Sequence, residues 1–356
     1  MAVPFPKPDN PLDFNSALEC TKLDAHFTLR NVPESSDNNL LIASWNIANF
    51  GVQDRTDESL LTLAFIMKRF DLIAVQEVND NFREFVRCVE LMGDHFDFVM
   101  SDTGGNSERL AYVYNKNKVT ADELFGEVAL TERRFPKRDV TVRYQRHSQE
   151  MVQTFENVKF KPFDRNPFIG SFSSGNISFV MANVHLYFGA FQNSGSESKR
   201  LKYARRVLEI HALAKWARDR VKSGNAWNEH IILLGDMNIP NMEYNESTIK
   251  ALHKFSWKAV DLYRGSGLAR NEKLTRIGGS NLGNDKTYDQ IAFAPTDLKN
   301  RVKQHGVFDF DNAVFDEKWQ ELSAQLSNGK AVRAFNKYLR YYLSDHRPIW
   351  VELDRQ

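Results

Sequence analysis

Four short apolar runs in the sequence each end in an acid, an amide or a histidine. These runs are Leu41–Ile47, Leu72–Val78, Ile231–Asn238 and Tyr342–Ile349. Each of them predicts a buried strand that delivers polar side chains to its carboxyl end, where open α/β sheets bind their ligands. The side chains delivered in this way are Asn46, Glu77, Asp236, Asn238, Asp345 and His346.

Carboxylate and amide oxygens that converge at one edge of a sheet form a site for a hard cation. Such oxygens suit Mg²⁺ or Mn²⁺, and a metal of this kind can hold a phosphate. A zinc site is disfavoured because the two cysteines, Cys20 and Cys88, lack ligand spacing. Each polar residue alone could be a cap or a turn residue. Their occurrence at four strand ends together favours a functional site.

The length and composition limit the number of domains. The chain has 356 residues, of which 42% are hydrophobic and 26% charged, as in globular proteins. We expect an N-terminal arm over residues 1–38 and one mixed α/β domain over residues 39–356, with a helical insertion around residues 316–342. Predicted strands outnumber predicted helices and often follow one another directly, which favours a single mixed domain.

The two cysteines and the N-terminal residues bear on the compartment. Two cysteines cannot form a disulfide framework, the N-terminus lacks an apolar signal region, and no run is long enough to span a membrane. We therefore expect a soluble, cytoplasmic protein, monomeric and without a membrane partner. A regulatory protein partner is conceivable, but no motif identifies one.

The net charge of +1 says little about partners, because it averages over local clusters. The basic clusters lie in Arg133–Arg146 and Lys199–Arg206. Either cluster could follow a polyanion such as a nucleic acid. The alternative interpretation of each is a solvated surface.

Six motifs, in their order along the chain, resemble those of the endonuclease/exonuclease/phosphatase superfamily, whose type member is DNase I. They span about residues 40–354 and are Ser44–Ile47, Gln76–Val78, Asn183–Leu186, Gly235–Asn238, Tyr288–Ile291 and Ser344–Pro348. One such motif recurs by chance, whereas six in one order are specific. The resemblance implies a four-layer α/β sandwich, with two mostly antiparallel sheets packed face to face and helices outside. It also implies hydrolysis of a phosphoester with a divalent metal.

The resemblance implies metal ligands and a general base. Glu77 resembles the principal metal carboxylate, with Asn46 beside it and Asp345 as a further ligand of the metal or of water. His346 resembles the general base, and Asp289 resembles the carboxylate that holds its tautomer.

The resemblance also implies residues that contact the substrate phosphate. Asn238 and His185 would donate to phosphate oxygens, and His185 could instead assist the leaving group. Asp236 is the rival candidate for activating the water. Glu108 resembles an acid near the catalytic histidine, and Arg165 resembles an arginine that contacts the phosphate backbone. Cations and donors of this kind suit an anionic transition state.

Two positions separate this chain from one branch of the superfamily. Ala48 stands where the abasic-site endonucleases have an acid, and His185 stands where they have a tyrosine. Both differences favour the DNase I-like side. We therefore expect an Mg²⁺- or Mn²⁺-dependent DNA endonuclease that acts by in-line attack of an activated water. The alternatives are a phosphatase or phospholipid phosphodiesterase of the same fold, an RNase, and an inactive binding scaffold.

Overall fold

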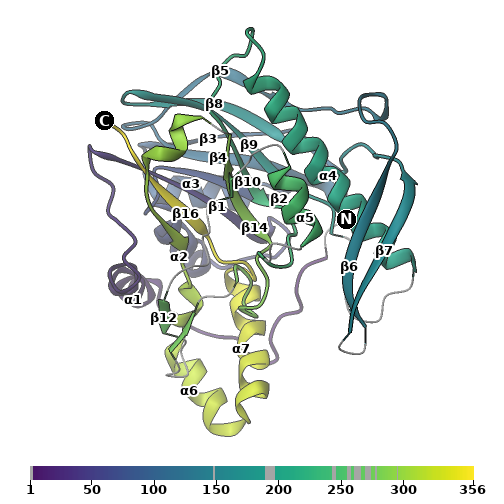
Figure 1. Ribbon diagram of the computed structural model, residues 1–356. Coiled ribbons are helices and arrows are strands. Elements are labelled where there is room, and N and C mark those ends of the chain that lie inside the picture. Colours follow the sequence, from purple (N-terminus) through teal and green to yellow (C-terminus); the bar gives the residue numbers. More distant parts are fainter. Residues whose placement is uncertain are drawn as a thin grey trace.

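The computed structural model describes residues 3–146, 149–188, 197–242, 246–254, 258–259, 266–268, 274–276, 279–294 and 296–356. Two six-stranded sheets pack face to face between helices (Figure 1). The first has the order β15 (Val302–Val307), β16 (Ile349–Asp354), β1 (Asn39–Phe50), β2 (Leu72–Asn79), β4 (Glu108–Asn115) and β3 (Phe96–Met100). The second has the order β11 (Lys258–Ala259), β14 (Asp289–Phe293), β10 (Ile231–Asp236), β9 (Ile177–His185), β8 (Phe168–Ser174) and β5 (Thr120–Glu127).

Each sheet contains a parallel pair at its centre. These pairs are β1 with β2 and β9 with β10, and the other neighbouring strands of the described residues are antiparallel. This arrangement confirms the predicted sandwich of two mostly antiparallel sheets. It also places the carboxyl ends of two neighbouring strands at the same edge of each sheet, which antiparallel neighbours cannot do.

The central strands are buried on both faces, which explains why they read as continuous apolar runs. In β1, Leu40 and Ile42 point into the core between the two sheets, and Leu41 and Ala43 point into the core beneath the helices. Side chains of a strand alternate between its faces, so a strand in the middle of such a sandwich needs apolar residues at nearly every position.

Helices cover the outer face of each sheet (Figure 1). Those over the first sheet are α1 (Ser16–Leu29), α2 (Asp57–Met67) and α3 (Arg83–Met92). The helices α6 (Asp316–Gln325) and α7 (Asn328–Tyr342) contribute buried side chains to the same core from below the sandwich. Those over the second are α4 (Glu197–Val221) and α5 (Ser247–His253). The short 3-10 helices are η1 (Gly105–Ser107), η2 (Glu132–Arg134), η3 (Asp297–Arg301) and η4 (Phe310–Asn312). No helix among the described residues is long and apolar enough to cross a lipid bilayer.

The segment expected as an extended N-terminal arm is helical over Ser16–Leu29. The Asn15 side chain caps this helix by accepting a hydrogen bond from the amide of Leu18. Leu23 and Phe27 are buried in the core, and the ring of Phe27 stacks on Phe308 with 3.9 Å between centroids. The division into an arm and one domain stays a prediction.

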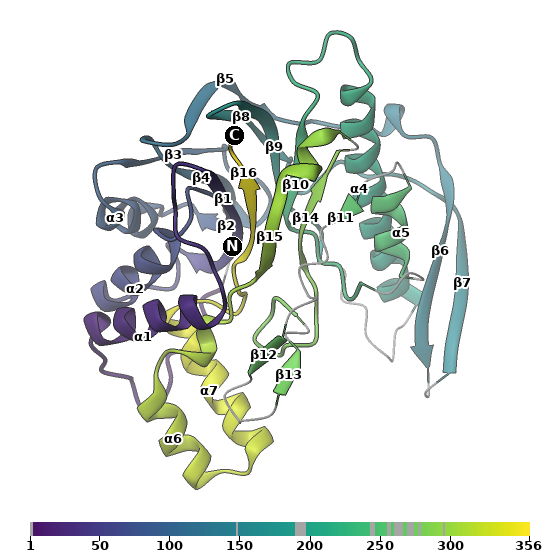
Figure 2. The ribbon, with the colours of Figure 1, turned by 60° about the vertical axis from the view of Figure 1, so that its left-hand side comes forward.

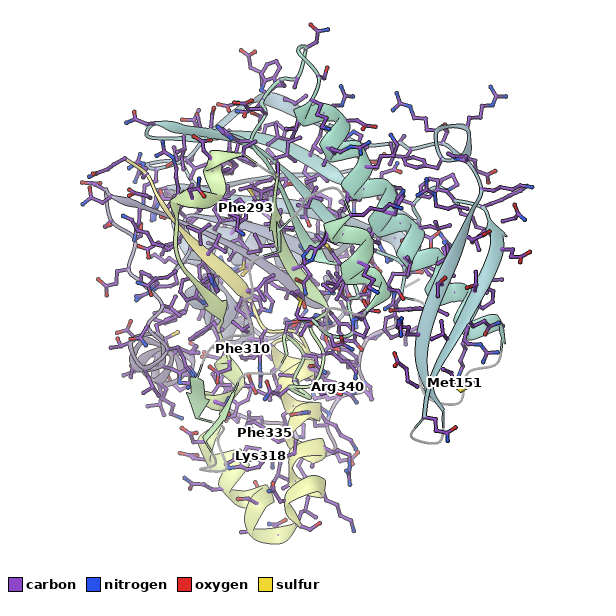
Figure 3. The ribbon with its side chains drawn as sticks, in the orientation of Figure 1. Met151, Phe293, Phe310, Lys318, Phe335 and Arg340 are labelled. Atoms are coloured by element: carbon purple, nitrogen blue, oxygen red, sulfur yellow. The ribbon has the colours of Figure 1, made fainter. Side chains whose placement is uncertain are left out.

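Two projections extend beyond the sandwich (Figures 1 and 2). One is the two-stranded hairpin of β6 (Arg138–Arg146) and β7 (Gln149–Val158), and the other contains α6 and α7. Near the second projection lies the short pair β12 (Ser266–Leu268) and β13 (Leu274–Arg276). Figure 3 labels Phe335 inside the helical projection, where its ring packs on Trp319. The segment 316–342, which was expected to be helical, contains the two helices α6 and α7.

Candidate active site

Asn46 joins the two sheets at the edge where the parallel strands end. It lies on β1 of the first sheet, and its Nδ2 donates to Glu77 Oε1 on β2 at 3.0 Å. The same nitrogen donates to Asp236 Oδ2 on β10 of the second sheet at 3.1 Å. The three predicted site residues are therefore in direct contact, although 190 positions separate Asn46 from Asp236.

The environment of Asn46 fits a bound cation. Because Nδ2 faces both carboxylates, the amide orientation is set, and Oδ1 is buried without a hydrogen-bond donor among the described residues. A buried acceptor without a partner is costly unless something positive meets it. Glu77 supplies a carboxylate beside it, and Asp345 supplies another that is close enough to Glu77 and Asp236 for their charges to affect it. These three residues are the candidate ligands of an Mg²⁺ or Mn²⁺ ion.

The charges around Asp345 also favour a bound cation. Burial, with the negative charges of Glu77 and Asp236 nearby, raises the pKa of the Asp345 carboxyl. Carboxylates crowded in this way repel one another, and a divalent cation would relieve the repulsion.

Two site residues hold an unusual backbone conformation. Glu77 has a φ of 64° and Asn238 a φ of 53°, both in the left-handed region that side chains other than glycine seldom adopt. Such residues cost about 1–3 kcal/mol each and cluster at functional sites. The turn at Glu77 is held by the amide of Asn49, which donates to Glu77 Oε2 at 2.9 Å.

His346 and Asp289 form the predicted pair. His346 Nδ1 lies 2.8 Å from Asp289 Oδ2, and Ser280 Oγ donates to the same oxygen at 2.5 Å. Asp289 is fully buried. Trp45 Nε1 donates to the His346 carbonyl at 2.8 Å, which fixes the backbone of this residue. Since Nδ1 faces a carboxylate, it carries the proton of the neutral ring, and Nε2 is then the nitrogen that can accept a proton.

Three carboxylates influence the charge of His346. Burial by itself would lower the pKa of the imidazole, but Asp289, Asp236 and Asp345 raise it well above its usual value. Asp236, Asp289 and His346 each bring one ligand atom within 4.8 Å of the others, so this cluster is a second place for a metal. The direct hydrogen bond between His346 and Asp289 instead favours a proton-transfer pair.

Asp236 lies between two histidines. Its Oδ2 is 3.6 Å from His185 Nε2 and 3.9 Å from His346 Nε2, and its Oδ1 accepts from the Asn238 amide at 2.9 Å. Burial would raise the pKa of this carboxyl, but His346 and His185 lower it overall. Asp236 is thus a carboxylate placed to share a proton or a water with either ring.

Glu108 and Arg165 support His185 from behind. His185 Nδ1 lies 2.9 Å from Glu108 Oε2, which is also 3.2 Å from Arg165 Nη1. Arg165 Nε donates to the His185 carbonyl at 2.9 Å, and only 7% of Arg165 is exposed. Sequence reasoning assigned Arg165 to the phosphate backbone. The structure gives it contacts of a positioning residue, and a direct phosphate contact stays a prediction.

Asn238 is held at the site by three backbone contacts. Besides its amide bond to Asp236, its Nδ2 donates to the Leu186 carbonyl at 2.9 Å. Its own carbonyl accepts from Arg206 Nη1. Within the part of the chain that the structure describes, Nδ2 donates to Leu186 alone, so its second hydrogen is available to a ligand.

Sequence reasoning missed the α4 residues Arg206 and Glu209. Only 2% of Arg206 is exposed, and its Nε donates to the Tyr187 carbonyl at 3.2 Å. Glu209 Oε2 accepts from the Tyr187 amide at 2.9 Å, and burial raises the pKa of Glu209 to about 7. Arg206 is therefore a buried support rather than part of a basic surface. Arg206 and Glu209, three residues apart, share a helix face with the apolar Ile210 and Leu213, and this spacing was the available signal.

Gln76 and Asn183 connect the sheets behind the site. Gln76 Nε2 donates to Asn183 Oδ1 at 2.7 Å, and Asn183 Nδ2 donates to the carbonyls of Val75 at 3.1 Å and Ala111 at 3.0 Å. Both side chains are fully buried. This pair fixes β9 against the first sheet and so sets the distance between His185 and Glu77. The sequence placed both residues in motifs but suggested no role for them.

Gly235 is required for the turn into Asp236. Its φ is +132°, and an added Cβ would lie 2.1 Å from the Val184 carbonyl oxygen. We expect Gly235→Ala to destabilise the protein by about 3 kcal/mol, because backbone of β9 must move. Gly126→Ala in β5 is the matched control, since a Cβ there meets nothing within 4 Å. Urea unfolding of both variants measures the difference, and equal midpoints would contradict the expectation.

No protein-family model and no curated protein matches the chain. Its structure is similar to solved structures of the endonuclease/exonuclease/phosphatase family. One, from Bacteroides thetaiotaomicron, is 15% identical, with a TM-score of 0.46, over 89% of this chain and 98% of that chain. Truncated Caenorhabditis elegans TDP2 is 13% identical, with a TM-score of 0.47, over 89% and 97%. The human Nocturnin catalytic domain is 12% identical, with a TM-score of 0.46, over 90% and 95%. Because these identities and TM-scores are low, the chemistry of the site has to be inferred from the side chains of this chain alone.

Proposed function

We propose that the chain is a divalent-metal-dependent phosphodiesterase and that it cleaves DNA internally. One observation carries the proposal: a candidate metal site and a histidine–carboxylate pair lie next to each other. The oxygen atoms of Asn46, Glu77 and Asp345 form the candidate metal site, and His346 with Asp289 forms the pair. Asp236 connects them, because it contacts both Asn46 and His346. Hydrolysis of a phosphodiester needs both a cation and a base.

The side chains of the site would divide the work as follows. Asn46, Glu77 and Asp345 would hold Mg²⁺ or Mn²⁺, which supplies Lewis-acid stabilisation of the phosphate charge when bound. His346 Nε2 would accept a proton from the attacking water, with Asp289 stabilising the resulting imidazolium. The water oxygen forms a bond to phosphorus, and the ester oxygen on the opposite side leaves with the bonding electrons.

His185 and Asn238 would bind the phosphate. Nε2 of His185 faces the interior of the site because Glu108 engages Nδ1, so the ring can donate to a phosphate oxygen or to the leaving oxygen. Asp236 remains the rival base, since its carboxylate lies near both rings. DNA as substrate rests on the resemblance of the motifs and on the basic segment Arg133–Arg146, part of which lies on the projecting hairpin.

Incubation with supercoiled plasmid tests the proposal. We expect nicked circles with Mg²⁺ or Mn²⁺ and intact plasmid with EDTA, because the chelator removes the cation that the carboxylates hold. Single-stranded RNA and inositol phosphates serve as parallel substrates. Cleavage of RNA or release of phosphate beside intact plasmid would replace DNA as the substrate. The absence of hydrolysis in every metal-containing reaction would contradict an enzymatic function.

A further inference from the structure

A groove of about 870 Å³ lies on the outer side of the second sheet. Its walls come from β5, β8, the C-terminal part of α4 and the segments that follow β5 and α4. Ile231 in this groove begins β10, and Asp236 of the candidate active site ends it. At the rise of a strand, the two places are about 16 Å apart. Figures 1 and 2 show β5 and β8 at the top, away from α6 and α7.

The floor of the groove is apolar, and a large aromatic ring stands beside it. Ile169 and Val180 contribute from the outer face of the sheet, and Trp216 contributes from α4. Trp227 is 58% exposed, although its Nε1 donates to Ser171 Oγ at 3.0 Å. The hydrogen bond restrains the indole while one face stays open to solvent. An exposed tryptophan fixed in this way is suited to stack on a flat ligand.

Two cations without partners line the same groove. The guanidinium groups of Arg134 in η2 and Arg220 in α4 form no hydrogen bond or ion pair with any described residue. Arg218, two residues before Arg220, contrasts with them because its Nη2 donates to Asp219 Oδ1 at 2.9 Å. A neighbouring hollow of about 310 Å³ is lined by the same two arginines and also by Lys215 and Asp219, which form an ion pair with each other. The positive charge that this hollow shares with the groove is therefore that of the two arginines.

Glu127, the acidic residue of the groove, already accepts hydrogen bonds from neighbouring residues. Glu127 Oε1 accepts from the Asp102 amide at 3.1 Å, and Glu127 Oε2 accepts from Asn166 Nδ2 at 3.2 Å. Both carboxylate oxygens of Glu127 are thus engaged by groups of the protein rather than left for a ligand. The groups that remain for a ligand are the open indole face and the two guanidinium groups.

These groups match an unpaired nucleotide. A base in a duplex has its faces covered by neighbouring bases, whereas an unpaired base can stack on an aromatic side chain. Arginine binds backbone phosphates of any sequence. An acidic peptide would satisfy the arginines but would leave the exposed tryptophan face without a matching flat group.

We propose that this groove binds a segment of single-stranded nucleic acid, with one base stacked on Trp227 and phosphates on Arg134 and Arg220. The choice of nucleic acid as the polymer rests on the proposed function. A strand held here is beyond the reach of His346, so the groove would retain the polymer outside the bond that is cut.

Fluorescence anisotropy of a labelled oligothymidylate tests the groove, with EDTA present so that hydrolysis does not interfere. We expect Trp227→Ala to raise the Kd about tenfold, because one base loses its stacking partner. We expect the double variant Arg134→Gln/Arg220→Gln to weaken binding and to reduce the salt slope of log Kd by about 1.4, at 0.7 for each phosphate contact. Arg218→Gln is the matched control, since it removes an equal but paired charge from the same helix.

Each outcome decides between the proposals. Wild-type affinity and salt slope in both groove variants would overturn the groove, as would the absence of oligothymidylate binding by the wild-type protein. A drop in affinity for Arg218→Gln as large as for the double variant would also overturn it, because the effect would then be one of net charge. Hydrolysis of bis(p-nitrophenyl) phosphate with Mg²⁺ is measured on the same variants. Its failure in the wild-type protein would count against the proposed function and leave the binding result standing.

Discussion

Replacement of His346 by alanine is expected to lower kcat for phosphodiester cleavage by about 10²–10⁴-fold, which is the contribution of a positioned general base. The expectation rests on geometry. His346 Nδ1 is engaged by buried Asp289 at 2.8 Å, so Nε2 is the nitrogen that can take a proton, and it faces Asp236 at 3.9 Å. KM should change little, because the ring is expected to act on the water rather than on substrate binding. Single-turnover cleavage of plasmid measures the rate.

Two further variants separate catalysis from structure. Asp289→Asn keeps the shape of the side chain but loses the charge that stabilises an imidazolium, and it should reduce kcat by a similar order. His230→Ala removes a histidine at the other end of β10, where the ring contacts Thr296 Oγ1 at 3.0 Å. It should leave kcat unchanged. Activity of His346→Ala equal to that of His230→Ala would assign the base to another residue, with Asp236 as the first to test.

The strands and the site could be predicted because both depend on local sequence. A strand in the middle of a sandwich requires a run such as Leu72–Val75, and chemistry at a sheet edge requires the polar residues that follow it. Asn46, Glu77 and Asp236 each lie at such an end, and the structure brings them into contact. The parallel pairs supply the reason, because they place neighbouring carboxyl ends together.

The features that were missed depend on contacts between distant segments. Helix α1 has little periodicity, and it is stabilised by partners such as Phe308, which stacks on Phe27 from 281 positions away. By residue type, Arg206 does not differ from the half-buried Arg200 and Arg205 near it, and its partners, the carbonyls of Tyr187 and Asn238, come from other segments of the fold. Burial of a charged residue requires such partners, and they cannot be identified before the fold is known.

Replacement of Glu77 by glutamine is expected to reduce kcat/KM by about 10³-fold, because a weakened metal site loses several kcal/mol of charge stabilisation in the transition state. The substitution keeps the size of the side chain. Its single amide oxygen can accept from Asn46 or from the Asn49 amide but not from both, so one of these two hydrogen bonds is lost. Plasmid cleavage across a series of Mg²⁺ concentrations measures the loss. Part of it should be recovered at high Mg²⁺, which a purely structural defect would not show.

Thermal unfolding measures Mg²⁺ binding at the same site independently of activity. A cation that binds only the folded protein stabilises it, by about 2.7 kcal/mol at a concentration of one hundred times its Kd. We expect Mg²⁺ to raise the Tm of the wild-type protein and to have little effect on Glu77→Gln. Without metal, the Tm of Glu77→Gln should lie close to that of the wild-type protein, because the lost hydrogen bond is offset by the removal of a negative charge near Asp345 and Asp236.

Glu90→Gln is the control for loss of charge, since its carboxylate lies on the surface of α3 beside Arg87 and outside the site. It should keep the full response of the Tm to Mg²⁺. A Glu77→Gln protein that also kept this response would place the metal elsewhere. The alternative is the cluster of Asp236, Asp289 and His346, whose ligand atoms lie within 4.8 Å of one another. In that case His346 would be a ligand, and the base would have to be sought among the remaining side chains of the site.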